Sequence, residues 1–230
     1  MPSSVSNSEW LKAYFADVSR DLTPASLQPA LVVLHAAVSK DPEVTERCCS
    51  VLSDAELQRA KRFAVPDQSN LFKQRRAFRR YCGALATGSS DALSQITFCG
   101  MENGQPRLLG QPDFRFSFSS CRLGFLAAWS SAFAPGVDFE DPGREIEAVD
   151  LARRYYSRTE ARAVESAGGL ARPNQFFQFW CLKEAALKSI GEGLPYGLDA
   201  FEFDLDPAVR VVRVPPEHGL PGHFKASLIE

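Results

Sequence analysis

The segment GVDFE, residues 136–140, places two carboxylates one residue apart between apolar neighbours. In a strand, successive side chains point to opposite faces, so Asp138 and Glu140 would share a face roughly 6.5–7 Å apart. Two acids this close raise the pKa of each other unless a cation lies between them. Oxygen ligands suit a hard divalent cation, Mg²⁺ above all. The pair predicts either a metal site or a solvent-exposed strand face, which is the commoner use of such pairs.

A second group lies in the segment FFQFWCLKEAALKSIGEGL. Trp180, Glu184 and Lys188 follow at intervals of four, which places them on one stripe of a helix, and Lys183 lies on the adjoining stripe. A stripe that changes from aromatic to acid to base could bring charge to the edge of a cleft. The alternative is an ordinary surface helix in which Glu184 and Lys188 form an ion pair worth about 0.2–0.5 kcal/mol.

The third group is the basic run KQRRAFRRY, residues 73–81. On a helix, Arg75 aligns with Arg79 and Arg76 aligns with Arg80. Such a run is usually a solvated face, but it also suits a patch that binds phosphates or an acidic partner.

The composition limits the function classes. A chain of 230 residues can form one large domain or two small ones, and its net charge of −2 argues against general nucleic-acid binding. No apolar run reaches the roughly 18–20 residues that cross a bilayer, and the N-terminus lacks the features of a secretion signal. Six cysteines without a C-x-x-C pair and three scattered histidines give no zinc framework, which favours reduced, mostly buried thiols in a cytosolic protein.

Periodicity and capping signals predict the elements that must position these groups. Ser53 with Glu56, and Ser157 with Glu160, are capping boxes that start helices. Two further helices are expected over 69–88 and 175–194, each closed by glycine, and one over 147–156. Strands are expected over 31–38, on both sides of the Asn-Gly turn at 103–104, and over 123–130, 136–140, 198–205 and 223–230. Residues 1–28 are expected to form an extension on the surface.

The order of strand, capped helix, helix and strands occurs twice along the chain. This order indicates either two related halves or a chance recurrence of two common capping boxes. Along residues 114–119, three phenylalanines alternate with Arg115, Ser117 and Ser119, so the aromatic and polar side chains are expected on opposite faces of one strand.

Taken together, these motifs resemble the 4′-phosphopantetheinyl transferase superfamily, and specifically its larger, monomeric members that activate carrier proteins of peptide and polyketide synthases. GVDFE is similar to the family's G-[IV]-D-[IV]-E, and residues 180–194 are similar to its W-x-x-K-E-x-x-x-K-x-x-G-x-G-L. NGQPRL and RFSFSS stand where the family has Gly-Lys-Pro and Asn-x-Ser-His-Ser. The resemblance runs from about residue 30 to the end.

The resemblance implies an α+β fold of two similar α/β halves arranged as a pseudo-dimer, with the active site in the cleft between them. On that plan, residues 1–28 are an N-terminal extension, 29–115 the N-terminal half, and 116–230 the C-terminal half that carries the metal and catalytic motifs. The last predicted strand ends where the family continues into another strand, so the second half is expected to be truncated or shortened.

The activity implied is the Mg²⁺-dependent transfer of 4′-phosphopantetheine from coenzyme A to a serine of an apo carrier protein, with release of 3′,5′-ADP. Asp138, Glu140 and Glu184 would hold Mg²⁺. Glu184 is the candidate general base, and Lys188 would steady the leaving group. The residues expected to contact coenzyme A are Arg59, Arg75, Arg79, Gln105, Pro106, Ser117, Lys183 and Lys188. A cytoplasmic monomer is expected, with no nucleic acid or membrane partner, and with an acidic helix of the carrier docked on arginines 73–80.

Three positions depart from the family pattern: Phe118 replaces its His, Arg115 its Asn, and Gln105 its Lys. Because the His and Lys normally help to hold the phosphates of coenzyme A, the loss of two charge-assisted contacts could weaken cofactor binding about a hundredfold. A second hypothesis is therefore a degenerate, non-catalytic relative that binds carrier protein or coenzyme A. A generic Mg²⁺ phosphohydrolase ranks third, because no nucleophile motif supports it.

Overall fold

An antiparallel sheet forms the base of the N-terminal half, and both of its faces are covered. The computed structural model describes residues 5–24, 30–100 and 105–229, and within these residues six strands pair in the order β1-β2-β6-β5-β4-β3. The strands are β1 (Ser19–Asp21), β2 (Val32–Ala37), β3 (Phe98–Gly100), β4 (Pro106–Leu108), β5 (Gln111–Cys121) and β6 (Gly124–Ser130). Their bounds confirm the strands expected over 31–38 and 123–130. The Asn-Gly turn at 103–104 lies outside the described residues.

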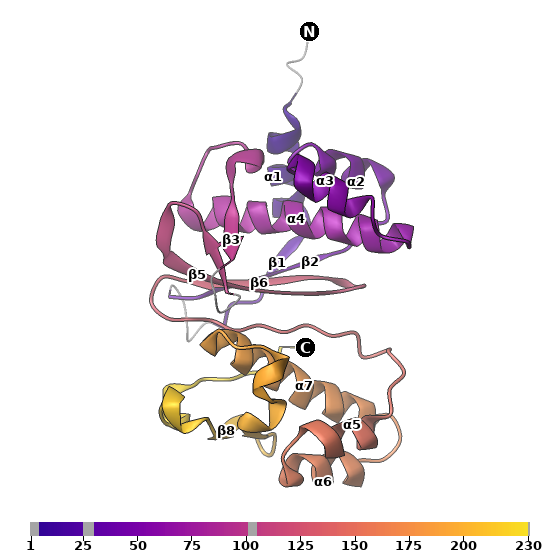
Figure 1. The fold of residues 1–230 in the computed structure, drawn as a ribbon, viewed down its shortest axis with the longest axis vertical. Helices are drawn as coiled ribbons and strands as arrows, with labels where there is room; N and C mark the ends of the chain where they lie inside the picture. The colour runs from indigo at the N-terminus through magenta and orange to yellow at the C-terminus, as the bar shows by residue number, and fades with distance from the viewer. Residues whose placement is uncertain (1–4, 25–29, 101–104, 230) are drawn as a thin grey trace.

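One face of the sheet is covered by the helices α1 (Asn7–Val18), α2 (Pro42–Cys49), α3 (Asp54–Ala60) and α4 (Pro66–Thr87). The long helix α4 runs across the sheet, and the three shorter helices pack around it (Figure 1). The first core lies between these two layers. The phenylalanines of β5 point into this core, and Ser117 and Ser119 point to the other face, where they contact residues 137 and 138. The predicted alternation along 114–119 is thereby confirmed.

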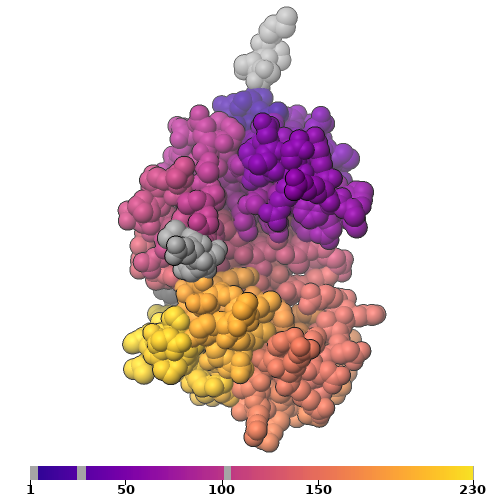
Figure 2. Space-filling view, in the orientation of Figure 1, coloured from indigo at the N-terminus to yellow at the C-terminus, as the bar shows by residue number. Residues whose placement is uncertain are grey.

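The C-terminal half lies on the opposite face of the sheet (Figure 1). It consists of α5 (Ala148–Tyr155), α6 (Arg158–Ser166), α7 (Ala171–Ile190) and the hairpin β7 (Glu202–Asp204) and β8 (Arg210–Arg213). These elements enclose a second core. Figure 2 shows this half, in orange to yellow, packed against the N-terminal half.

Local signals in the sequence start and stop the helices as expected. Both capping boxes are formed, at α3 and at α6, with the serine hydroxyl accepting from the glutamate amide and the glutamate side chain accepting from the serine amide. Gly88 and Gly191 end α4 and α7 in the left-handed conformation, with φ of 62° and 82°, which a residue with a Cβ rarely adopts. Pro66 lies beyond the end of α3 at Ala60 and is the first residue of α4.

The α+β class is confirmed, and the two halves share part of their order. Each has a short helix, a capped short helix and a long helix that ends at a left-handed glycine. Their sheets differ, because the first half has six strands and the second half has two among the described residues. The pseudo-dimer therefore stays a prediction.

Two expected strands are absent from the described residues. Residues 136–140 join no ladder, and residues 224–229 are irregular chain that follows a short 3₁₀ turn at Pro221–His223. Alternate residues of the last segment, Phe224, Ala226 and Leu228, still pack on the second core. The alternation of apolar and polar residues in the sequence correctly indicated which side chains pack on the core. It did not indicate a strand, because a strand also needs a neighbouring strand with which to form hydrogen bonds.

The boundaries of the predicted N-terminal extension and of the two predicted halves differ from the boundaries of the observed elements. The segment expected to be a surface extension supplies Leu11 and Phe15, which are at most 2% exposed, and the edge strand β1. Its expected end at residue 28 lies outside the described residues. The expected boundary after residue 115 falls inside β5, and the same sheet continues to the end of β6. Among the described residues, no helix has the length and apolar character needed to span a membrane.

Gly136 sets the distance between the extended segment and α7. A Cβ at this position would overlap the carbonyl oxygen of Ala185 and lie 2.9 Å from the amide nitrogen of Ser189. We therefore expect Gly136→Ala to destabilise the fold by about 1–3 kcal/mol, because helix and segment must separate. The measurement is the free energy of unfolding in urea. Gly168→Ala is the control, since nothing lies within 4 Å of a Cβ there. Equal stability of the two variants would contradict the close packing.

Candidate active site

The segment 136–140 is held between the sheet and α7 by side chains. The amide of Val137 donates to Ser117 Oγ at 3.1 Å, and its carbonyl accepts from Lys188 Nζ at 3.2 Å. These bonds replace the ladder of the strand that the sequence predicted. The two predicted motifs, far apart in the sequence, therefore meet at the seam between the two halves.

Asp138 is the most buried acid of the segment, with a side chain 5% exposed. Its Oδ1 accepts from Ser119 Oγ at 2.8 Å and from Lys188 Nζ at 2.6 Å. Its Oδ2 is buried and has no hydrogen-bond partner among the described residues. A solvent-exposed strand face is therefore excluded as the explanation of GVDFE. Lys188 forms its ion pair with Asp138. The alternative, in which Lys188 pairs with Glu184 on an ordinary surface helix, is therefore not what the structure shows.

Glu140 and Glu184 belong to the same electrostatic group. Burial, followed by the charge of Asp138, raises the pKa of Glu140, although Arg144 and Lys188 oppose the shift. Burial also raises the pKa of Glu184, where Lys188 opposes and the other two acids add to the shift. The charges of Asp138, Glu140, Glu184 and Lys188 thus influence one another, which puts the two sequence motifs in the same region of the molecule.

The donor set fits a hard cation in its chemistry. Asp138 offers an unpartnered buried oxygen. The two glutamates resist ionisation, first because they are partly buried and then because the charge of Asp138 acts on both; Glu140 adds to the effect on Glu184. In the described part of the chain, no group of three or more His, Cys, Asp and Glu side chains is already gathered closely enough to hold a metal. Binding by all three acids would thus require their side chains to converge.

Lys183 does not reach this site, contrary to its predicted contact with coenzyme A. Its side chain is fully buried and pairs with Glu160 at 2.6 Å. Nζ also donates to the carbonyl oxygens of Leu198, at 3.0 Å, and Phe201, at 2.5 Å. Burial lowers the pKa of Lys183, and Glu160 opposes the shift. The sequence held a signal for this outcome, because Lys183 lies four residues after Phe179 and four before Leu187, both of which are buried on α7.

Trp180 also packs into the second half. Its ring lies 5.7 Å from that of Phe176 and 6.5 Å from that of Tyr155, measured between centroids. Of the predicted stripe Trp180, Glu184 and Lys188, Trp180 thus belongs to the core of the C-terminal half.

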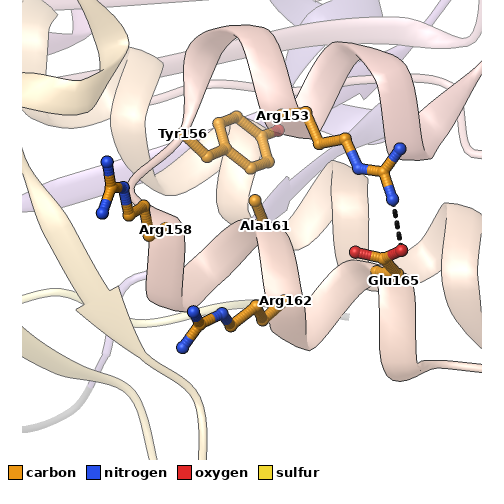
Figure 3. Close-up of a pocket in the computed structure, with 6 residues that line it drawn as sticks. All are labelled: Arg153, Tyr156, Arg158, Ala161, Arg162 and Glu165. Carbon is orange, nitrogen blue, oxygen red and sulfur yellow. Dashed lines mark hydrogen bonds and ion pairs between the residues drawn. The ribbon is translucent and has the colours of Figure 1, made fainter.

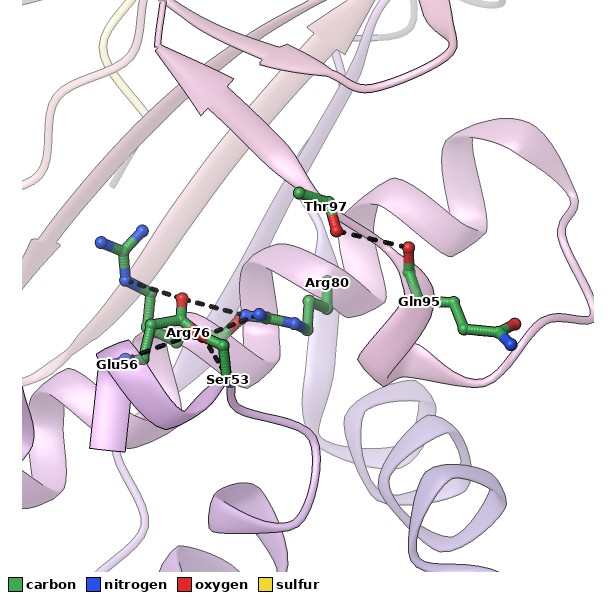
Figure 4. Close-up of polar contacts among 6 residues, drawn as sticks. All are labelled: Ser53, Glu56, Arg76, Arg80, Gln95 and Thr97. Atoms are coloured by element: carbon green, nitrogen blue, oxygen red, sulfur yellow. Dashed lines mark hydrogen bonds and ion pairs between the residues drawn. The ribbon is translucent and has the colours of Figure 1, made fainter. Parts of the chain in front are cut away.

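The basic run on α4 divides into paired and unpaired arginines. Glu56 binds Arg80 at 2.7 Å and Arg76 at 3.4 Å (Figure 4). Among the described residues, Arg75 and Arg79 form no ion pair. Arg75 donates to Ser120 Oγ at 3.3 Å. Arg79 lies 4.7 Å from the centre of the Phe118 ring.

Arg79 is a half-buried cation that forms no ion pair in the described structure. Burial, and then the neighbouring charges of Arg75 and Arg76, lowers its pKa to about 9. It lines a pocket of about 300 Å³ between α3, α4 and β3, together with the paired arginines and the hydroxyls of Ser94 and Thr97. Arg59 is exposed and lies over the ring of Phe72. This arrangement suits an anion with several oxygens.

The remaining predicted contacts lie at the seam between the halves. Gln105 Nε2 donates to the carbonyl oxygens of Lys188 and Ser189 at the end of α7. Pro106 begins β4, and Ser117 is 3% exposed with its hydroxyl bound to Val137. Ser117 therefore supports the acidic segment and is closed off from a cofactor.

Sequence reasoning missed several residues and one further pocket. The sequence identified Ser119 only as one of the polar residues on β5, and not as a hydrogen-bond donor to Asp138. It identified Glu160 only as a capping residue, and not as the partner of Lys183. A pocket of about 200 Å³ between α5 and α6 is lined by Arg153, Tyr156, Arg158, Ala161, Arg162 and Glu165 (Figure 3). It contains an exposed ion pair of Arg153 with Glu165 and none of the three clustered acids.

All six cysteines are free, but only Cys48 and Cys82 are fully buried. The expectation that the thiols are mostly buried was therefore wrong. Cys99 is exposed and the other three are half-buried.

Comparison with known proteins agrees with the motifs. Residues 134–226 match the model of the 4′-phosphopantetheinyl transferase superfamily. The chain is 31% identical over 131 residues to the 4′-phosphopantetheinyl transferase psf-1 of Bacillus pumilus, covering 56% of this chain and 54% of that protein. It is 28% identical over 126 residues to the 4′-phosphopantetheinyl transferase Sfp of Bacillus subtilis, covering 54% and 55%. A putative 4′-phosphopantetheinyl transferase of Synechocystis is 27% identical over 181 residues, covering 77% and 72%.

The matched region thus spans about half the length of psf-1 and of Sfp. The region from residue 134 to residue 226, which carries both long motifs, is thus similar to the 4′-phosphopantetheinyl transferase superfamily. The resemblance inferred from the sequence is thereby confirmed.

The buried pair of Lys183 and Glu160 gives a test of its structural role. We expect Lys183→Met to cost about 3–5 kcal/mol of unfolding free energy, because it leaves Glu160 charged and buried. The double variant Glu160→Gln with Lys183→Met should recover most of this loss, since it removes both charges and keeps an acceptor for the amide of Phe203. Arg153→Ala, at an exposed pair, is the control and should cost less than about 1 kcal/mol. A similarly small cost for Lys183→Met would refute the role.

The raised pKa of Glu184 predicts how stability depends on pH. A carboxyl whose folded pKa is raised favours folding fully below its unfolded pKa and loses this contribution as pH rises through the folded pKa. Glu184→Gln should therefore match the parent chain near pH 4 and exceed its stability at about pH 7.5. Urea unfolding in EDTA measures this difference, with Glu46→Gln on the exposed face of α2 as control. A difference that does not change with pH would contradict the shift.

Proposed function

We propose that the protein transfers the 4′-phosphopantetheine group of coenzyme A to a serine hydroxyl of an apo carrier protein, with Mg²⁺, and releases 3′,5′-ADP. The observation that carries the proposal is the contact of Lys188 with Asp138 at the seam between the halves, within reach of the charges of Glu140 and Glu184. The names of psf-1 and Sfp support the same reaction.

The reaction joins a hydroxyl to a phosphate that is already negatively charged, so its main requirement is control of charge. Asp138, through its unpartnered oxygen, and the two glutamates would hold Mg²⁺, which would neutralise the pyrophosphate and polarise it. Lys188 is hydrogen-bonded beside Asp138, and from there it would stabilise the negative charge that develops on the leaving 3′,5′-ADP.

Glu184 is our candidate for the general base that takes the proton of the serine. Because Glu184 is also a candidate ligand of Mg²⁺, it would act either directly or through a water held by the metal. The seryl oxygen then forms the new bond to phosphorus as the bond to the 3′,5′-ADP oxygen breaks.

Arg75 and Arg79 are proposed to receive the nucleotide end of coenzyme A. Arg79 is half-buried and forms no ion pair among the described residues, and a phosphate would provide a balancing anion. Arg76 and Arg80 are already bound to Glu56, so fewer arginines of α4 are left to dock an acidic helix. The basic run at residues 73–81 is therefore better suited to the nucleotide. We further propose that the protein works as a cytoplasmic monomer on carrier proteins of peptide or polyketide synthases.

A non-catalytic carrier-protein or coenzyme A binder is the second candidate, and two observations favour it. The Phe118 ring is packed with Phe98, Phe116 and Arg79, so it provides no hydrogen bond to a phosphate. Gln105 is bound to the end of α7.

A transfer assay separates the two candidates. The protein is incubated with coenzyme A, Mg²⁺ and a panel of apo carrier proteins, and the intact mass of each carrier is followed. We expect a carrier to gain the phosphopantetheine mass, and Asp138→Asn or Glu184→Gln to slow transfer at least about a hundredfold.

The exposed Asp150→Asn on α5 is the matched control and should keep full activity. If no carrier gains mass while calorimetry detects coenzyme A binding, the non-catalytic candidate holds. If the Asp138 and Glu184 variants both stay active, the metal assignment is refuted.

A further inference from the structure

The side chain of Gln105 links the start of β4 in the N-terminal half to the end of α7 in the C-terminal half. Its Nε2 donates to the carbonyl oxygen of Lys188 at 3.0 Å and to that of Ser189 at 3.3 Å. The last carbonyls of a helix lack the amides of a following turn. At the end of α7 the amide of Gly191 donates to the carbonyl of Lys188 at 3.2 Å, and Gln105 adds a second donor there. Gln105 therefore supplies, from the other half of the molecule, part of the C-terminal cap of α7.

The same turn of α7 is also held from the side of the acidic segment. The amide nitrogen of Ser189 lies so close to Gly136 that a Cβ there would be 2.9 Å away. Lys188 Nζ bonds the carbonyl of Val137 and the carboxylate of Asp138. The last turn of α7 is thus fixed between Gln105 and the segment that begins at Gly136.

We propose that Gln105 is a positioning residue for Lys188. The proposal rests on the function proposed above, because Lys188 has a chemical role only if the transfer occurs. Gln105 holds the backbone of Lys188 itself, so its two bonds fix where the ammonium group lies relative to Asp138. Small displacements of a charged group from its productive geometry cost rate more than they cost substrate binding.

Steady-state kinetics of Gln105→Ala test the proposal in the full chain, with coenzyme A and an apo carrier. We expect kcat to fall about tenfold and the KM for coenzyme A to stay within about twofold. Gln111→Ala is the matched control, since Gln111 is an exposed glutamine on the neighbouring strand β5, and its kcat should not change. A rise in KM with an unchanged kcat would overturn the proposal, because it would make Gln105 a direct contact of coenzyme A.

Two further substitutions separate positioning from simple loss of stability. Gln105→Glu places an acceptor against two carbonyl oxygens and should lower kcat more than the alanine variant does. Gln105→Lys keeps a donor for these carbonyls and should restore kcat to within about threefold of the parent chain. Equal losses in all three variants, at equal fractions of folded protein, would contradict the proposal.

A second measurement does not depend on activity. Amide hydrogen exchange should become faster around the end of α7, over residues 186–192, in Gln105→Ala, with no change in α4. Unchanged exchange there would overturn the proposal. If the parent chain modifies no carrier, the proposed function fails, while exchange still decides whether Gln105 fixes the end of α7.

Discussion

The ion pair between Lys188 and Asp138 lies at the seam between the two halves, where the proposed chemistry occurs. Asp138 is almost fully buried, and a buried carboxylate is costly unless charge and hydrogen bonds compensate it. Lys188 and Ser119 compensate one oxygen and leave the other without a partner. The structure around this pair, from the close approach at Gly136 to the bonds of Gln105, keeps the lysine and the acid at this distance.

Features set by near neighbours in the sequence could be predicted. The capping boxes, the glycines that end α4 and α7, and the alternation on β5 depend on residues within a few positions of each other, and all are confirmed. The convergence of Asp138, Glu140 and Glu184 was predicted from the family motifs and not from the residues alone.

Features that depend on a distant partner were missed. Residues 136–140 alternate as a strand does, but α7 and side chains of β5 lie beside them where a strand would have to be. Gln105 was assigned to coenzyme A because of its place in a motif, and nothing near it in the sequence indicated the end of α7, 83 residues away. The exception is Lys183, whose spacing from Phe179 and Leu187 already marked it as a core position of α7.

The fully buried pair of Lys183 and Glu160 has a consequence for how the C-terminal half folds. Its hydrogen bonds come from α6, α7, the turn at Leu198–Ala200 and the start of β7, so the charges are satisfied only when all these parts are in place. A partly assembled half would bury an ion without its partners, which is unfavourable. Intermediates are thereby suppressed, and this half should form and melt as one cooperative unit.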